Sequence, residues 1–247
     1  EFDNLNKKMQ VQTVCLHGPS PYSYYFPDYL VKINGSTLCN WGCPDPSNNI
    51  GNLQFIIIDS VTGLPWRNKK DLATNKGRFG SAAPCRYKTN GVDFDDPYFE
   101  FELRTTDQRN TARSFFDSIP NGVYVMMRNR LCVGSGCGVK NSRFINTWMD
   151  DTTVNGSGQS LYHTIKNFGF TMIDSFTKNR PMSFFMQKGF PNSIVQNMGI
   201  DSTVKLIVEY DFKSTLYNGN ITSDKIGPAK LWNNFIKKAY SLDATPE

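Results

Sequence analysis

The chain has 247 residues, of which 39% are hydrophobic and 13% aromatic, so one large domain or two small ones can bury a sizeable core. Charged residues make up 20% and both signs are spread along the chain, which argues against disorder. The net charge of +5 and the short basic run 67–70 are too small for a nucleic-acid interface, and no apolar run approaches the ~18 residues that span a bilayer. The first residues, Glu1-Phe2, include neither an initiator Met nor a signal-peptide pattern, so we expect a processed chain or a fragment.

The N-terminal part of the chain is predicted to form antiparallel strands, at residues 9–17 and 28–33. Asn34-Gly35 follows the second of these and predicts a tight hairpin turn. Residues 40–52 are rich in Pro, Asn and Gly and are expected to form a loop. Residues 53–58 are almost continuously apolar, which fits a strand buried on both faces, and Thr62-Gly63 turns the chain out of it.

A strand, a helix and another strand are predicted after the polar, irregular segment 65–96. Apolar and charged residues alternate from Phe99 to Arg104, which predicts a half-buried strand with one face in water. Thr105 and Gln108 have the spacing of a capping box, and the apolar residues after them repeat at helical spacing. The helix is therefore expected over 106–118, with Pro120-Asn121-Gly122 as its stop and a buried strand at 123–127.

The last third of the chain is predicted to contain a long irregular segment, a helix and two strands. Residues 133–159 are rich in Gly, Ser, Asn and Asp, and Ser157 or Ser160 could cap a helix that ends at Gly169. Strands are expected at 182–186 and 203–210, and a short helix after Pro228. We therefore predict one α/β domain over 9–212, with two facing β-sheets or a curled mixed sheet flanked by two main helices, and a C-terminal appendage over 213–247.

The six cysteines leave two interpretations open. An even number suits disulfides in an exported protein, and the pairing cannot be deduced from spacing alone. The alternative is a zinc site made by two closely spaced pairs. Those pairs are Cys39 with Cys43 and Cys132 with Cys137; the other two residues are Cys15 and Cys85.

No recognisable catalytic set is present in the sequence. The chain has two histidines, His17 and His163, and no nucleophile, phosphate-loop or zinc-protease motif. Cys15 or Cys132 acting with His163 would make a cysteine hydrolase, which is the remote alternative to a non-catalytic domain.

Two further groups of residues are candidates for binding. Asp93, Asp95 and Asp96 have part of the pattern of a calcium loop, but the pattern favours a solvated acidic loop, so no metal site is predicted. Trp41, Trp66 and Trp148 fall in predicted loops beside Asn and Asp, where aromatic rings can stack on sugars. The alternative for each tryptophan is that its ring plugs the end of a β-sandwich.

The order of the predicted segments resembles that of the interleukin-like EMT inducer domain. In that family a hairpin precedes an Asn-x-Gly-x-Leu motif, and the buried strand after the motif ends in a Thr-Gly or Ser-Gly turn. Here these are Asn49-Ile-Gly-Asn-Leu53 and Thr62-Gly63. A strand, a helix, a Gly stop and an apolar strand follow over 98–127. A second helix ends at a Gly, like Gly169, before an Arg-containing strand that ends in Lys-Gly, here 180–189. The resemblance covers about residues 10–210 and implies that fold type.

The segment 222–232 resembles the one that follows such a domain in gingipain-like (C25 peptidase-type) surface proteins of bacteria with a type IX secretion system. The resemblance implies a non-catalytic, cofactor-free interaction domain of a secreted or cell-surface protein, with any catalytic Cys/His dyad outside this chain. Its expected partners are other domains of the parent protein or outer-membrane proteins. Because a related stem domain in a glycosyltransferase binds carbohydrate, a carbohydrate-binding module is the alternative function and glycans are alternative ligands.

The family pattern also suggests where a ligand binds. Arg180 matches a family Arg, whereas Arg128-Asn129 stand where the family usually carries one or two Asp. We expect recognition in the irregular segments 41–52, 64–97 and 128–158. The predicted ligand-binding residues are Arg180, Trp148, Trp66, Trp41, Arg128 and Asn129.

Overall fold

The structure is a computed structural model that describes residues 6–13, 30–39, 52–71, 76–77, 79–80, 97–103, 105–130, 145–177, 180–201 and 204–215. All of them belong to one compact unit, Asn4–Tyr217. Several predictions fall outside the described residues: those on Trp41, on His17, on the acidic residues Asp93, Asp95 and Asp96, on every cysteine except Cys39, and on the helix after Pro228. The boundary predicted at 212/213 stays a prediction.

The described strands form two antiparallel sheets that pack face to face. The larger sheet has the order β10-β9-β8-β4-β7, and the smaller sheet has the order β11-β1-β2-β3. The larger sheet consists of β4 (Asn52–Ile58), β7 (Phe99–Glu102), β8 (Tyr124–Arg130), β9 (Met182–Gln187) and β10 (Val195–Met198). The smaller sheet consists of β1 (Asn6–Thr13), β2 (Val31–Ile33), β3 (Ser36–Cys39) and β11 (Leu206–Lys213). A short pair, β5 (Lys70–Asp71) and β6 (Lys76–Gly77), lies apart from both.

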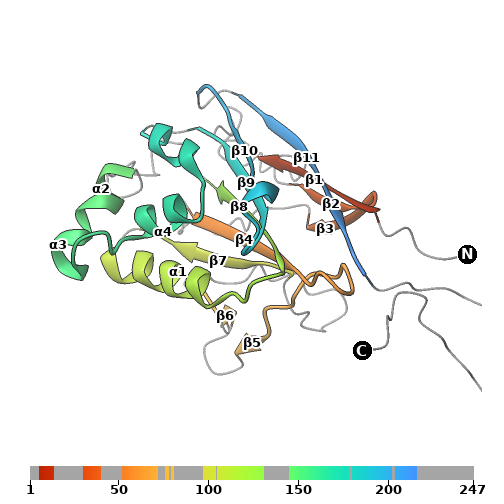
Figure 1. Cartoon of the computed structure of the whole chain (residues 1–247), viewed down its shortest axis with the longest axis horizontal. Helices are drawn as coiled ribbons and strands as arrows, with labels where there is room; N and C mark the ends of the chain where they lie inside the picture. Colours follow the sequence, from red (N-terminus) through yellow and green to blue (C-terminus); the bar gives the residue numbers. More distant parts are fainter. Residues whose placement is uncertain are drawn as a thin grey trace, which may run out of the picture. The chain divides into compact units, whose positions relative to one another are not determined.

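Helices cover the face of the larger sheet that points away from the smaller one (Figure 1). They are α1 (Thr106–Ser118), α2 (Ile145–Asp150), α3 (Thr152–Asn155) and α4 (Leu161–Asn167), with 3₁₀ turns at Thr171–Ser175 and Pro191–Ser193. Alternate residues of each central strand therefore face different layers. In β4, Leu53, Phe55 and Ile57 pack under the helices, whereas Ile56 and Ile58 pack against the smaller sheet. The larger sheet is the middle of three layers.

The fold agrees with the sequence in its class and in several elements. The chain is mixed α/β with two antiparallel sheets, as predicted, and no named strand pair within the described residues is parallel. The capping box of α1 is confirmed, since Gln108 N donates to Thr105 Oγ1 at 3.3 Å and Thr105 N donates to Gln108 Oε1 at 3.2 Å. The hairpin at Asn34-Gly35 is confirmed by φ angles of 48° and 79°.

Several predictions were wrong in detail. The segment 133–159 contains the helices α2 and α3, and β10 was not predicted at all. The polar face of β7 does not lie in water at Glu100, which is buried because it points toward the smaller sheet. Finally, β11 begins and ends three residues later than the predicted strand 203–210.

Lys188, after β9, caps the C-terminal end of α1. Its buried ammonium group donates to the carbonyl oxygens of Phe116, Asp117 and Ile119 at 2.5–2.9 Å and lies 4.8 Å from the centre of the Phe168 ring. Burial lowers the pKa of this amine. The contact attaches the end of α1 to the sheet, because the last carbonyls of a helix have no partner within it.

We predict that Thr105→Ala destabilises the fold by about 1 kcal/mol, because it removes the N-cap acceptor of α1. The matched control is Thr111→Ala, an exposed site in the middle of the same helix where alanine is a good helix former. Urea unfolding should show a lower midpoint for Thr105→Ala only, with an unchanged slope. Equal midpoints for the two variants would contradict this role of the cap.

Candidate functional site

Several strand ends meet at one end of the sandwich, which we call the Asn129 end. It comprises the last residues of β1 and β8 and the first residues of β4 and β9. In the register of the larger sheet, Leu53 of β4 pairs with both Phe101 and Asn129, so β7 also finishes there. Thr13 Oγ1 donates to Asn129 O at 3.1 Å, which joins the two sheets at this end.

The buried side chain of Asn129 fixes the backbone that precedes β9. Its Nδ2 donates to Arg180 O at 2.8 Å, and its Oδ1 accepts from Met182 N at 2.7 Å. The amide thus pairs with the chain as another peptide group would. Asn129 therefore has a structural role in the interior, where it fixes the position of the Arg180 backbone just before β9.

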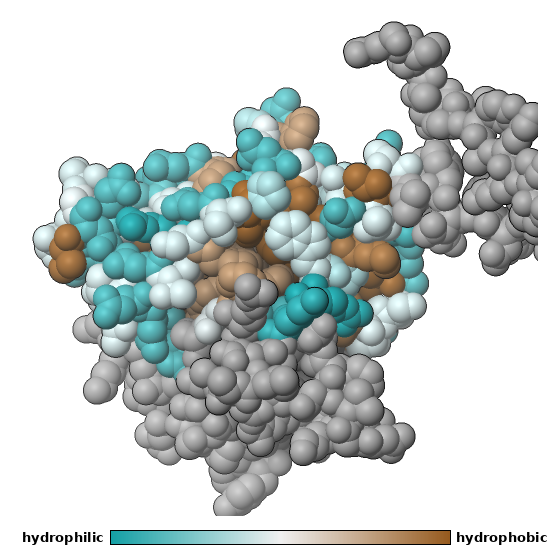
Figure 2. Space-filling view, turned by 90° about the horizontal axis from the view of Figure 1, so that it is seen from below, coloured by the Kyte–Doolittle hydropathy of each residue, from teal (hydrophilic) through white to brown (hydrophobic). Residues whose placement is uncertain are grey.

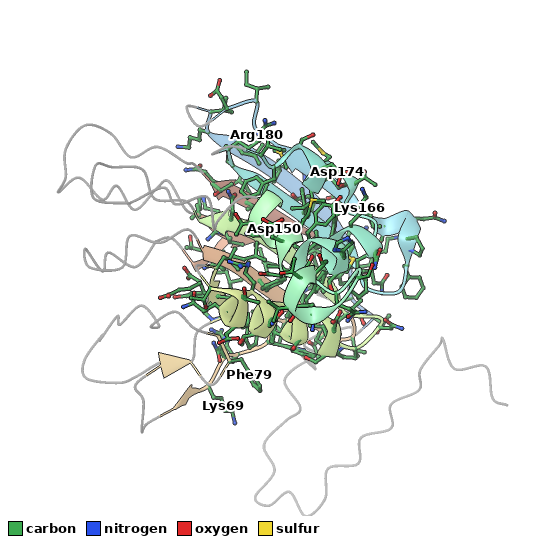
Figure 3. The ribbon with its side chains drawn as sticks, turned by 90° about the vertical axis from the view of Figure 1, so that its left-hand side faces the viewer. Lys69, Phe79, Asp150, Lys166, Asp174 and Arg180 are labelled. Carbon is green, nitrogen blue, oxygen red and sulfur yellow. The ribbon has the colours of Figure 1, made fainter. Side chains whose placement is uncertain are left out.

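Arg180 is half-buried, and its Nε is enclosed without a hydrogen-bond partner in the part of the chain that the structure describes. The guanidinium is a charged group with five N–H donors, and a buried donor that is left without an acceptor is costly. Figure 3 shows Arg180 at the margin of the described part of the domain, far from Phe79 and Lys69. Arg180 is therefore the one predicted binding residue whose side chain combines partial exposure with an unused donor among the described candidates.

Trp148 lies on α2, not in a loop as predicted, and its ring is fully buried against Phe176, with 5.8 Å between ring centres. This burial favours the interpretation that the ring plugs the end of the sandwich, because no face is open for stacking on a sugar. Its Nε1, however, also lacks a hydrogen-bond partner among the described residues. Trp148 therefore contributes a second unused donor.

A buried ion pair that the sequence analysis missed holds α2 at the Asn129 end. Asp151, directly after α2, binds Arg109 of α1 through two oxygen–nitrogen contacts of 2.6 Å. Arg109 Nη1 also donates to the carbonyl of Leu103, just after β7, at 3.0 Å. The sequence does contain one sign that Arg109 is buried. Arg109 has the same helical spacing as the buried residues Ala112 and Phe116. Through this pair, Trp148 is fixed near the end of β7.

Arg128 is fully buried between the two sheets, although the strand was predicted to end before it. Its Nε donates to Gln54 Oε1 at 2.7 Å, and its Nη1 donates to the carbonyls of Gln12 at 3.0 Å and Leu30 at 3.5 Å. Gln54 in turn reaches Glu100 at 3.4 Å. The guanidinium is thus bonded to groups of the protein on both sheets, so its role here is to join them.

Polar residues at paired positions form a row across all five strands of the larger sheet. Strand pairing aligns Glu100, Gln54, Arg128, Ser183 and Asn197, and all of them face the smaller sheet. From β11, the Tyr210 hydroxyl lies 2.8 Å from both the carbonyl and the hydroxyl of Ser183. Burial raises the pKa of Tyr210 to about 12. Buried polar groups of this kind must be fully bonded, so the row constrains how the sheets dock.

The other predicted binding residue that can be located is Trp66. It is half-buried beside the main core, and its backbone N–H donates to Ile57 O at 2.8 Å. Exposed apolar residues gather near it along the chain, at Val61, Leu64 and Phe79. On the face seen in Figure 2, apolar surface is bordered by hydrophilic residues. Figure 3 places Phe79 on the opposite side of the molecule from Arg180, so Phe79 is not part of the Asn129 end.

Two local clusters resemble catalytic groups but have structural explanations. Ser160 Oγ lies 2.8 Å from His163 Nδ1, yet Ser160 is fully buried and is the N-cap of α4. On the surface, Lys166 contacts Tyr162 and Asp174 (Figure 3). The hydrogen bond to Tyr162 and the one to Asp174 raise the pKa of Lys166 to about 12, so the amine is charged. Within the described ranges, no group of three His, Cys, Asp or Glu side chains could hold a metal ion.

We predict that Arg128→Met destabilises the domain by about 3 kcal/mol, because it leaves Gln54 and the two backbone carbonyls without their donor. Arg113→Met is the control: Arg113 is a partly exposed residue of α1, and its loss should cost about 0.5 kcal/mol or less. Denaturant unfolding measures both. Similar stabilities for the two variants would show that the buried guanidinium does not join the sheets.

We predict that Tyr210 makes the fold sensitive to alkaline pH. The pKa is about 12 in the folded state and 10.0 in the reference state, so the protonated phenol favours folding below pH 10. That contribution is lost as pH rises from about 10 to 12, by about 3 kcal/mol at most. Tyr210→Phe has no phenol to ionise, so its free energy of unfolding does not fall for this reason. The difference in free energy of unfolding between wild type and Tyr210→Phe should therefore shrink between about pH 10 and pH 12. Parallel stability–pH curves would contradict the prediction.

Comparison of the sequence with protein-family models and with curated proteins gives no match. None of the helices that the structure describes has the length and apolar character of a membrane span.

Proposed function

We propose that this chain is a non-catalytic binding domain, of the interleukin-like EMT inducer type, in a secreted or cell-surface bacterial protein associated with type IX secretion. The order of sequence motifs over about residues 10–210 supports the family. The two facing antiparallel sheets with flanking helices are compatible with it. The segment 222–232 supports the association with secretion.

The observation that carries the proposal is the pair of unused donors at the Asn129 end. Arg180 Nε and Trp148 Nε1 are both buried without an acceptor among the described residues. Such a group costs about 1–3 kcal/mol unless a ligand, water or another part of the protein supplies the missing acceptor. A ligand that brings oxygen acceptors to this end recovers that free energy at Arg180, which is half-buried, whereas the Trp148 ring is fully buried.

A protein ligand with an exposed carboxylate fits these donors best. Arginine binds carboxylates through two parallel N–H donors, and it is less strongly hydrated than lysine. Asn129 holds the Arg180 backbone in place, so less freedom is lost when a ligand binds. We therefore propose that an acidic surface of another domain of the parent protein, or of an outer-membrane protein, binds here.

Carbohydrate binding is the second candidate. Sugar hydroxyls also accept hydrogen bonds, and they would suit the donors of the half-buried Arg180. The mode that the sequence suggested, stacking on Trp148, is not favoured by the full burial of that ring. A glycan would thus bind through polar contacts without that stack.

Calorimetric titration with two probe sets tests the proposal: short acidic peptides capped at both ends, and a panel of neutral oligosaccharides. We expect acidic peptides to bind, and Arg180→Met to weaken their binding by about 10-fold or more, as loss of a charge-assisted hydrogen bond implies. The control Arg113→Met should leave the dissociation constant unchanged. Binding of oligosaccharides alone would support the second candidate, and equal affinities of wild type and Arg180→Met would refute this site.

A further inference from the structure

Among the strands that the structure describes, β11 is a long edge strand with no partner on one side. It forms the margin of the smaller sheet and pairs with β1 along all eight of its residues. Open edges of this length are templates for pairing with another chain, and proteins usually shorten or cover them.

Strand register identifies the outward backbone groups. The backbone N–H and C=O of Gln12 in β1 exchange hydrogen bonds with those of Leu30. The even-numbered residues of β1 therefore direct their backbone N–H and C=O groups toward β2, and the odd-numbered residues direct theirs toward β11. The register of β1 with β11 pairs odd with even residues, so the odd-numbered residues of β11 direct their N–H and C=O groups outward. Lys213 agrees with this parity, because its N–H donates to the Tyr124 hydroxyl, away from β1.

The open part of the edge runs through Ile207, Glu209 and Asp211. Beyond it, Lys213 and Thr215 bond to Tyr124 and to Ser60 O. The backbone N–H groups of the three open residues have no hydrogen-bond partner among the described residues.

The side chains on this edge are apolar at the centre and oppositely charged on either side. Ile207 is 54% exposed, and Lys205 and Glu209 are exposed two residues before and after it. The neighbouring strand β10 and the turn after it add the exposed residues Val195 and Ile200. An aliphatic residue in this position is unusual on a solvated sheet face, where polar residues normally alternate with buried ones.

We propose that two copies of this chain pair antiparallel through β11, with Ile207 of one copy opposite Ile207 of the other. In this register Lys205 lies opposite Glu209 twice, once on each side of the two-fold axis, and cross-strand pairs of opposite charge stabilise a sheet. A register centred on Glu209 places Glu209 opposite itself and Lys205 opposite Lys213, so like charges oppose each other. Charge complementarity thus favours a second copy as the occupant, with Ile207 rather than Glu209 at the centre. This proposal does not depend on the ligand at the Asn129 end.

Two charge reversals test the pairing in the full chain. In Lys205→Glu the dimer would contain two Glu–Glu pairs, and in Glu209→Lys it would contain two Lys–Lys pairs. A mixture of the two variants restores opposite charges at both positions. We expect sedimentation velocity to show a concentration-dependent wild-type dimer, at least 10-fold weaker self-association of each variant alone, and recovery in the equimolar mixture.

The control Lys69→Glu makes the same charge change outside both sheets and should dimerise like wild type. Circular dichroism verifies that each variant is folded, because Glu209→Lys also removes the exposed pair with Lys8. A wild-type chain that stays monomeric at every concentration overturns the proposal. So does a mixture that associates no better than the separate variants.

Discussion

The arrangement of the two sheets depends on one buried guanidinium. Arg128 carries a positive charge into the interface, and removing a charge from water costs several kcal/mol unless good hydrogen bonds replace the lost solvent. Gln54 and the carbonyls of Gln12 and Leu30 supply those bonds, from both sheets. A slip of β8 by one residue would turn Arg128 toward the helices, away from all three acceptors. The interface therefore specifies the register of the strands that end at Asn129.

A second buried arginine performs the corresponding task on the other face of the larger sheet. Arg109 joins Asp151, the residue after α2, to the carbonyl of Leu103 after β7. The two arginines lie in different layers, yet both act at the same end of the sandwich. Between them they fix Asn129 and the backbone of Arg180 on one side and α2 with Trp148 on the other. The two unused donors are thus held by rigid elements, which favours binding with little loss of freedom.

The sequence predicted those features of the structure that depend on contacts between residues close together in the chain. The capping box at Thr105 and Gln108 and the turn at Asn34-Gly35 involve neighbours in sequence, so the pattern was sufficient. The burial of Glu100 and Arg128 was not predictable in the same way, because it depends on contacts between distant parts of the chain. Alternation indicates that two faces differ, but not that a second sheet covers the polar one.

The candidate site was predicted only in part, for a related reason. Arg180 was identified by resemblance, and Trp148 by composition near Asn and Asp. The helix that buries Trp148 is short, and it is held by the long-range pair of Arg109 with Asp151, 42 residues apart in sequence. Propensity within 133–159 favours loops, and tertiary contacts overrode it. Arg128 and Asn129 were proposed as ligand contacts, whereas their side-chain groups bond to the interior of the protein.

We propose above all that a ligand binds at the Asn129 end through Arg180. The most direct measurement is the ¹H–¹⁵N correlation of the Trp148 indole N–H, assigned with Trp148→Phe, during titration with a capped acidic peptide. We expect the Trp148 resonance to shift with peptide concentration and its proton to exchange more slowly with water when the site is full. We expect Arg180→Met to remove both changes. An indole resonance that stays fixed while the peptide binds elsewhere would contradict this proposal.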